Sequence, residues 1–406
     1  MIESQAQAGA TAARPEVVVG VLAQPDRLVA SEAATRVDAQ LRTAFPSRAS
    51  LAVVLTPDTH GATAPGDPLA RSVDGAPYCV HTGGHPGPEA GLQTLLELAV
   101  AQGAPACALI EPVARESDAR WLRLLLDPIL EGGFDLTCPS YARSRLDGLL
   151  NTGIAYPLTR ALFGQRLRQP LGPEIALSSG LAETLLREEW PLEGATGPSD
   201  LWIVTKALAR GVKLCQAWLG PMPARLEKPP EVARAVANVL GIVFREMERH
   251  APRWQRVAGS EPVPTFGQLS PVEEHAPPGV ATLLSAFTLG WQDLRPIWSA
   301  ILPPHALLSL QRLPREPPEA FRMPDALWAR VVYDFAVGWR TKVMDRNQLL
   351  LSMTPLYLGW VASWVNEVGG LDADAAEARL ERLCEAFEQE KRYLISRWRW
   401  PERFSP

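Results

Sequence analysis

Short apolar runs rich in β-branched residues alternate with helical patterns from residue 16 to residue 218 of this chain. Such an alternation is typical of a mostly parallel sheet with helices on both faces. We therefore predict an α/β domain over residues 16–228. Its expected strands are 16–23, 51–56, 78–81, 106–110, 134–139 and 214–218, and its expected helices are 28–45, 89–101 and 119–130.

The remainder of the chain follows the helical period, which predicts an all-helical domain over residues 229–406. Asp372 stands where the N-cap of the last expected helix should lie. A stretch rich in Pro and Gly at 257–280 is expected to be a connecting loop, and residues 1–15 a disordered leader. The helices expected here are 233–248, 281–302, 326–341, 346–368 and 373–397.

Composition narrows the class of protein. The chain has 406 residues, of which 47% are hydrophobic and 21% charged, and its net charge is −5. This length is more than one hydrophobic core usually needs, and the missing basic face argues against a nucleic-acid partner.

The five cysteines are scattered without metal-site spacing, which favours buried reduced thiols. No secretory signal is visible, so we expect a cytoplasmic protein. The uncharged run 348–365 contains Pro355 and is expected to be a buried, bent helix rather than a membrane span.

The most informative run begins at residue 151. A basic helix end with Arg160, Arg166 and Arg168 leads into a Gln-Pro-Leu-Gly turn at 169–172. A short apolar strand follows, and then a helix that opens at Ser199-Asp200. This order resembles the acceptor half of GT-A fold nucleotide-sugar glycosyltransferases, of the mannosylglycerate-synthase-like or family 2 type.

The resemblance implies a GT-A, Rossmann-like mixed sheet followed by a helical domain. It also implies a nucleotide-sugar donor, UDP- or GDP-linked, and a small hydroxylated acceptor such as glycerate. On the acceptor side it assigns catalytic roles to Glu174 and Asp200, and substrate contacts to Gln169 and Gly172. For Asp200, a role as an ordinary first-turn carboxylate of a helix is the alternative.

On the donor side the resemblance points to Asp58, Gly84, His85, Gly87 and Glu111. Where the family has an Asp-x-Asp turn, this chain has Glu-Pro-Val at 111–113. Ala224 stands in the place of the family's metal-binding His, and Pro88 in the place of its donor-contacting Lys. We therefore expect no metal at the donor site, with the Gly-rich loop at 83–87 offering backbone N–H groups to a diphosphate. The alternatives are plainer. Glu111 is then a solvent-facing strand end, Asp58 a turn residue, and the loop an ordinary helix start.

Two functions follow from these features. The first is a hexosyltransferase with a metal-independent donor site. The second is a catalytically inactive scaffold of the same fold that binds sugar, nucleotide or a partner protein, because several donor motifs are altered together. A nucleotidyltransferase is a weaker third hypothesis, since its phosphate loop would be richer in Gly and Lys. A homo-oligomer is compatible with the sequence.

Overall fold

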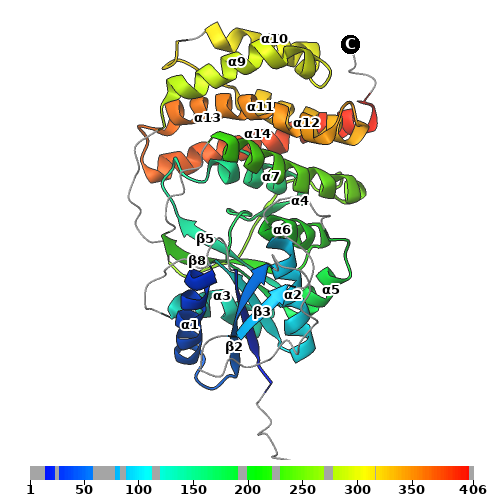
Figure 1. Ribbon diagram of the computed structural model, residues 1–406. Coiled ribbons are helices and arrows are strands. Elements are labelled where there is room, and N and C mark those ends of the chain that lie inside the picture. The colour runs from blue at the N-terminus through cyan, green and yellow to red at the C-terminus, as the bar shows by residue number, and fades with distance from the viewer. Residues whose placement is uncertain are drawn as a thin grey trace, which may run out of the picture. The chain divides into compact units, whose positions relative to one another are not determined.

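The computed structural model describes residues 14–22, 27–57, 78–82, 88–111, 119–190, 199–221, 229–268, 278–315 and 317–401. The described residues pack into two compact units (Figure 1). The sheet unit takes in those of Met1–Leu136 and Glu174–Trp190. The helical unit takes in those of Thr137–Pro173 and Pro191–Pro406. Packing thus groups residues 137–173 and 199–221 with the C-terminal helices.

The strands of the sheet unit run in the order β7-β4-β1-β2-β3. Strand β1 (Val17–Leu22) lies between β2 (Ser50–Pro57) and β4 (Ala106–Ile110) and is parallel to both. β3 (Tyr78–Thr82) is parallel to β2, and β7 (Ile175–Ser178) is antiparallel to β4. The predicted mixed sheet is therefore confirmed.

Helices cover both faces of these strands. Figure 1 shows α1 (Arg27–Ala44) and α3 (Arg120–Leu130) on one side, and α2 (Pro88–Gln102) and α5 (Ser179–Leu186) on the other. Because both faces are covered, the central strands are apolar along their whole length and the side chains of β4 are all buried. At Gly20 in β1 the packing is close, since a Cβ there would lie 2.7 Å from Leu55 Cδ1.

The helical unit also contains strands. β8 (Leu214–Pro221) lies between β5 (Leu136–Ala142) and the short β10 (Thr265–Phe266), which is parallel to it. β6 (Gln165–Arg166) pairs in parallel with β9 (Glu261–Pro262). The first part of the predicted connecting loop at 257–280 thus adds an edge strand to β8 and a partner to β6.

The predicted C-terminal helices are present, with one division and three additions, which are the helix at 251–254, the helix at 304–312 and the short turn at 313–315. The run 346–368 is broken at Met353 because Pro355 opens a new helix, where its missing N–H costs no hydrogen bond. Helix α10 was not predicted. The helices of this unit are η1 (Asn151–Ala155, a π-helix), α4 (Tyr156–Phe163), α6 (Ser199–Arg210), α7 (Pro229–Arg249), α8 (Ala251–Trp254), α9 (Val280–Ser299), α10 (Pro304–Arg312), η2 (Leu313–Arg315), α11 (Asp325–Thr341), α12 (Arg346–Ser352), α13 (Thr354–Val368) and α14 (Ala373–Arg399).

The ends of these elements follow capping rules. Asp372 is the N-cap of α14 as predicted, and its Oδ1 accepts a hydrogen bond from the Ala375 N–H at 2.8 Å. Cys107, Cys138, Cys215 and Cys384 are buried and free, which confirms the prediction for these four thiols. The side chain of Cys79 lies outside the described ones.

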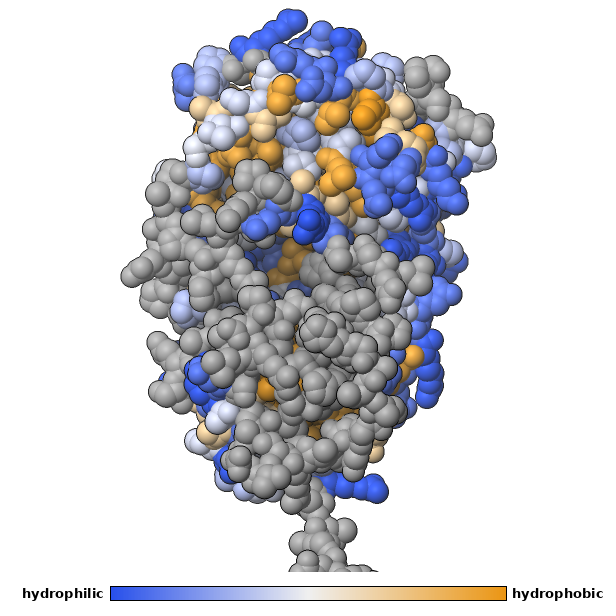
Figure 2. Space-filling model, viewed as in Figure 1, coloured by the Kyte–Doolittle hydropathy of each residue, from blue (hydrophilic) through white to orange (hydrophobic). Residues whose placement is uncertain are grey.

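The surface is mixed in character. On the face in Figure 2, apolar side chains lie among hydrophilic ones over the helices of the C-terminal region. Large apolar side chains that are mostly exposed include Leu289 and Leu308. Within the described ranges, no helix combines the length and the apolar character needed to cross a membrane.

Candidate functional site

Two of the predicted site carboxylates meet at one edge of the sheet unit. In the antiparallel pair of β4 and β7, Leu109 is the partner of Ile175. The next step of this register brings Glu174 beside Ile110, one residue before Glu111. Glu111 thus follows the carboxyl end of a strand in the parallel part of the sheet, which is where open α/β sheets hold their ligands.

A small cavity joins these two carboxylates. Its lining includes Glu111, Glu174, Arg36, Gln40 and Trp121, which come from α1, α3 and the two strand ends. The volume of the cavity is about 10 Å³, which is room for about one water molecule. Glu174 is only 1% exposed. The structure therefore brings Glu111 and Glu174 together, as residues that line a common small cavity.

This cavity does not fit a divalent cation. Mg²⁺ keeps several of its waters when it binds to protein carboxylates, and the volume admits only one. The guanidinium-bearing Arg36 also lines the wall that the two carboxylates share. Across the described stretches of the chain, no group of three or more His, Cys, Asp and Glu side chains could hold a metal ion.

The predicted acceptor turn lies in the helical unit and is fixed by side chains. Gln169 forms two hydrogen bonds with the backbone of Tyr141: its Nε2 donates to the carbonyl at 2.8 Å, and its Oε1 accepts from the N–H at 3.2 Å. One residue earlier, the backbone N–H of Arg168 donates to Oε1 of Gln216 at 2.6 Å. Gln169 is buried, so its amide is used to anchor the turn to β5.

Gly172 and Asp200 are joined directly. The backbone N–H of Gly172 donates to Oδ2 of Asp200 at 2.7 Å, a short, charge-assisted hydrogen bond. Asp200 lies in the first turn of α6 and is buried. Glycine is required at the other end of this bond, because a Cβ on Gly172 would lie 2.2 Å from Cγ of Pro139.

Asn151 also belongs to this arrangement, and the sequence analysis did not identify it. Its Nδ2 donates to the Leu171 carbonyl at 2.9 Å, and its Oδ1 accepts from the Leu171 N–H at 3.2 Å. Asn151 opens η1, and single π-turns of this kind occur often at functional sites. The available signal was a polar residue at the head of an apolar helical run. Gln216, a polar residue inside strand β8, was missed in the same way.

The π-turn is held from the helical side by aromatic residues. Trp328 Nε1 donates to the Gly153 carbonyl at 2.8 Å. The Trp360 ring lies against Gly153, where a Cβ would come within 2.2 Å of Cζ3. Trp328 stacks on Trp360 with ring centroids 5.8 Å apart. The turn that carries Asn151 is thus packed under the rings of α11 and α13.

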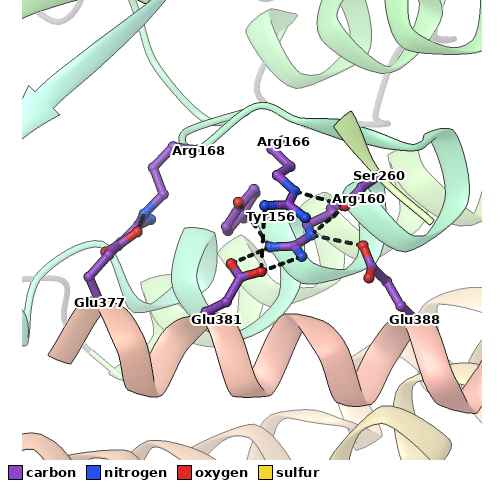
Figure 3. A network of polar contacts seen from close by, with 8 residues as sticks. All are labelled: Tyr156, Arg160, Arg166, Arg168, Ser260, Glu377, Glu381 and Glu388. Carbon is purple, nitrogen blue, oxygen red and sulfur yellow. Dashed lines mark hydrogen bonds and ion pairs between the residues drawn. The ribbon is translucent and has the colours of Figure 1, made fainter. Parts of the chain in front are cut away.

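The predicted basic helix end is buried in contacts with α14. Arg160 is 1% exposed, and its guanidinium forms two hydrogen bonds with Glu381, at 2.6 and 2.7 Å. Its Nε donates to Glu388 at 2.9 Å (Figure 3). Burial alone would lower the pKa of Arg160, but the two glutamates raise it, and Arg160 in turn lowers the pKa of Glu381.

The two neighbouring arginines face the same helix (Figure 3). Arg168 pairs with Glu377 at 3.1 Å. Arg166 lies 3.8 Å from Glu381 and donates to Ser260 at 3.1 Å. Each of the three arginines therefore already has an acidic partner on α14.

The remaining predicted site residues are on the donor side. Asp58, Gly84, His85 and Gly87 lie outside the described residues, as do Val113 and Ala224. Helix α2 begins at Pro88, which agrees with the interpretation of Pro88 as an ordinary helix-start residue.

Comparison with known proteins adds the following. No family model matches the sequence, and no protein of curated function matches it either. Glucosyl-3-phosphoglycerate synthase from Mycobacterium tuberculosis, in complex with phosphoglyceric acid, is similar over 58% of this chain and 80% of its own, at 19% identity and a TM-score of 0.41. Mannosyl-3-phosphoglycerate synthase from Rubrobacter xylanophilus is similar over 59% and 75%, at 15% identity and a TM-score of 0.45. A mannosyltransferase from Pyrobaculum calidifontis with GDP-Man and Mn²⁺ is similar over 88% of both chains, at 13% identity and a TM-score of 0.36. At these scores the likenesses assign no activity to this chain. They agree with the expected resemblance to nucleotide-sugar glycosyltransferases.

Proposed function

We propose that this protein transfers a sugar from a nucleotide-sugar donor to a small hydroxylated acceptor of the glycerate type, without a metal at the donor site. The observation that carries the proposal is the pairing of Glu111 and Glu174 on one cavity at the carboxyl end of β4. Ligands of open α/β sheets bind at such an edge. The acceptor-side sequence run, with its turn at 169–172, supports the same function.

In this reaction the bond between the anomeric carbon and the leaving phosphate oxygen breaks, and a bond from that carbon to the acceptor oxygen forms. The acceptor proton passes to a carboxylate, and the resemblance offers two candidates for it, Glu174 or Asp200. Gln169 and Gly172 would lie on the acceptor side. Glu111, Asp58 and the loop residues Gly84, His85 and Gly87 would contact the donor, with backbone N–H groups facing the diphosphate.

The second candidate is an inactive scaffold of the same fold. Two observations favour it. The cavity between the two carboxylates has room for about one water molecule. The arginines of the 160–168 segment are neutralised by α14. A scaffold would bind a nucleotide or a sugar without turnover.

Binding and transfer assays separate the two functions. Calorimetry with UDP-glucose, UDP-galactose and GDP-mannose, each with Mn²⁺ and with EDTA, should detect binding that does not need the metal. Mass spectrometry should then detect a glycosylated product with glycerate or 3-phosphoglycerate. Binding without any product would favour the scaffold, and binding that needs Mn²⁺ would contradict the metal-free site. The absence of any binding would contradict both the transferase and the scaffold.

The carboxylate role is tested in the same assay. Glu174→Gln should lower turnover by about a hundredfold to ten-thousandfold, because it removes the proposed proton acceptor. The matched control is Glu183→Gln on the exposed face of α5 in the same unit. It should leave turnover unchanged, and equal rates in both variants would rule out a role for Glu174.

A further inference from the structure

We propose that Asp200 is a positioning residue, which fixes the turn at 169–172 through the N–H of Gly172, and that Asn151 fixes the same turn through the backbone of Leu171. This inference rests on the proposed transfer function, since the turn leads along the chain directly to Glu174. It leaves the acceptance of the acceptor proton to Glu174.

The first support is the number of side chains that hold so short a segment. The backbone N–H groups of Arg168, Leu171 and Gly172 donate to Gln216, Asn151 and Asp200 respectively. The carbonyl of Leu171 accepts from Asn151 as well. Proline at position 170 has no N–H to satisfy. A turn held by side chains from η1, α6 and β8 has little freedom to change its shape.

The second support is the environment of the Asp200 carboxylate. It lies in the first turn of α6, where the unpaired N–H groups of a helix stabilise a negative charge. Its Oδ2 accepts from the Gly172 N–H at 2.7 Å. A carboxylate held in these contacts serves well as a fixed acceptor for a backbone N–H. A general base needs instead a lone pair within reach of the substrate hydroxyl.

The third support is the way Asn151 is placed. Trp328 holds the Gly153 carbonyl of the same π-turn at 2.8 Å, and Trp360 fills the space where a side chain at Gly153 would lie. The position of Asn151 is therefore set by the packing of α11 and α13. An amide that is oriented by its neighbours in this way can form both bonds to Leu171 with little loss of side-chain entropy.

A positioning role and a general-base role for Asp200 predict different effects of an asparagine at this position. Asp200→Asn keeps an oxygen that can accept from Gly172 but removes the basic carboxylate, whereas Asp200→Ala removes both. A positioning role predicts that Asp200→Asn keeps turnover within about threefold of the wild type, with the same pH profile. Asp200→Ala and Asn151→Ala should each lower kcat by about ten- to a hundredfold, the effect of a lost hydrogen bond to a fixed backbone.

Hydrogen exchange measures the turn without any assay of transfer. In Asp200→Ala the amide of Gly172 should exchange about ten- to a hundredfold faster than in the wild type, and in Asp200→Asn at nearly the wild-type rate. Thr205→Val is the matched control, because it changes another buried side chain of α6 whose hydroxyl bonds only within that helix. It should leave both the exchange rate and turnover unchanged.

The outcomes are distinct. If Asp200→Asn is as inactive as Asp200→Ala while the Gly172 amide stays protected, the carboxylate acts chemically and the positioning role is refuted. The role is also refuted if Asp200→Ala leaves Gly172 exchange unchanged. If the wild type transfers no sugar from any donor, the proposed function fails, and the exchange experiment still decides whether Asp200 and Asn151 fix the turn.

Discussion

The sheet unit and the helical unit use charged side chains in different ways. In the sheet unit, ion pairs such as Arg42–Asp38 and Arg123–Asp127 lie along exposed helix faces, with 76% of Arg42 and 56% of Arg123 open to solvent. In the helical unit, charges lie in the core. Lys206 and Glu246 are 2% and 0% exposed at 3.2 Å, and Asp334 and Arg397 are similarly buried at 2.9 Å.

Exposed and buried ion pairs contribute differently to the stability of the two units. Exposed pairs contribute about 0–1 kcal/mol, so the sheet unit depends on the apolar packing of its strands. A buried pair adds little net stability, but the loss of one partner leaves an uncompensated charge that costs about 3–5 kcal/mol. The helical unit should therefore tolerate single charge changes poorly, and the sheet unit should tolerate them well.

The largest effect is expected at the Lys206–Glu246 pair. Lys206→Met should lower the free energy of unfolding by about 3 kcal/mol, the lower end of the range for a broken buried pair, because Glu246 loses its closest cation but keeps Arg249 at 3.5 Å and His250 at 3.3 Å. Arg123→Met on α3 is the matched change in the sheet unit and should cost less than about 1 kcal/mol. Adding Glu246→Met to Lys206→Met should restore most of the loss. Urea unfolding of the variants measures this, and equal losses for the two single variants would refute the contrast between the units.

The second effect is a dependence on pH. Burial raises the pKa of Asp334 to about 6, against the pull of Arg397 and the hydrogen bond from Tyr393. An unfolded Asp titrates near pH 3.9, so the folded chain binds this proton more tightly between the two values. The contribution of Asp334 to stability is therefore present below about pH 4 and is lost as the pH rises to about 6, by at most about 3 kcal/mol.

Asp334→Asn should remove this slope and should not lower stability at neutral pH, because the amide stands in for the neutral acid and its oxygen can still accept from Arg397 and Tyr393. The free energy of unfolding at pH 4.5, 5.5, 6.5 and 7.5 in both proteins gives the comparison. The same slope in wild type and variant would show that another group titrates in this range.

The smallest of the three effects tests packing rather than charge. Gly153→Ala places a Cβ within 2.2 Å of the Trp360 ring and should cost about 1–3 kcal/mol. Gly180→Ala in α5 of the sheet unit meets nothing closer than 4.0 Å and should be neutral or stabilising by up to about 1 kcal/mol. Thermal unfolding of both variants checks the expectation. A neutral Gly153→Ala would mean that the aromatic stack shifts at little cost.

Much of the secondary structure could be predicted because its signals are local. The apolar run 106–110 became β4 without a change of bounds, and Asp372 caps the last helix as predicted. The elements that were not predicted are decided by features that the local apolar pattern does not contain. The period of 346–368 continues through Met353, yet Pro355 starts a new helix there. β10 is two residues long and exists only because β8 offers it an edge.

The candidate site could be predicted only as separate residues. Glu111 and Glu174 were each identified in the sequence, but their shared cavity depends on the pairing of β4 with β7. Asn151 and Gln216 show only a polar residue within an apolar run, since what defines them is a backbone partner 20 and 48 residues away in the chain. The three arginines at 160–168 were predicted as a basic helix end, and their glutamates lie more than 200 residues further on.

A side chain of the last helix, α14, caps the carboxyl end of helix α4. The Lys391 ammonium donates to the carbonyl of Ala161, which lies in the last turn of α4, and to the carbonyl of Val257. Burial lowers the pKa of Lys391 to about 8. Lys391 lies 230 residues beyond Ala161. During synthesis at about 5–20 residues per second, α4 therefore waits roughly 10–50 s for this contact. The described strands of the sheet unit, by contrast, have all been synthesised once β7 has emerged, so they can pair well before Lys391 is available to α4.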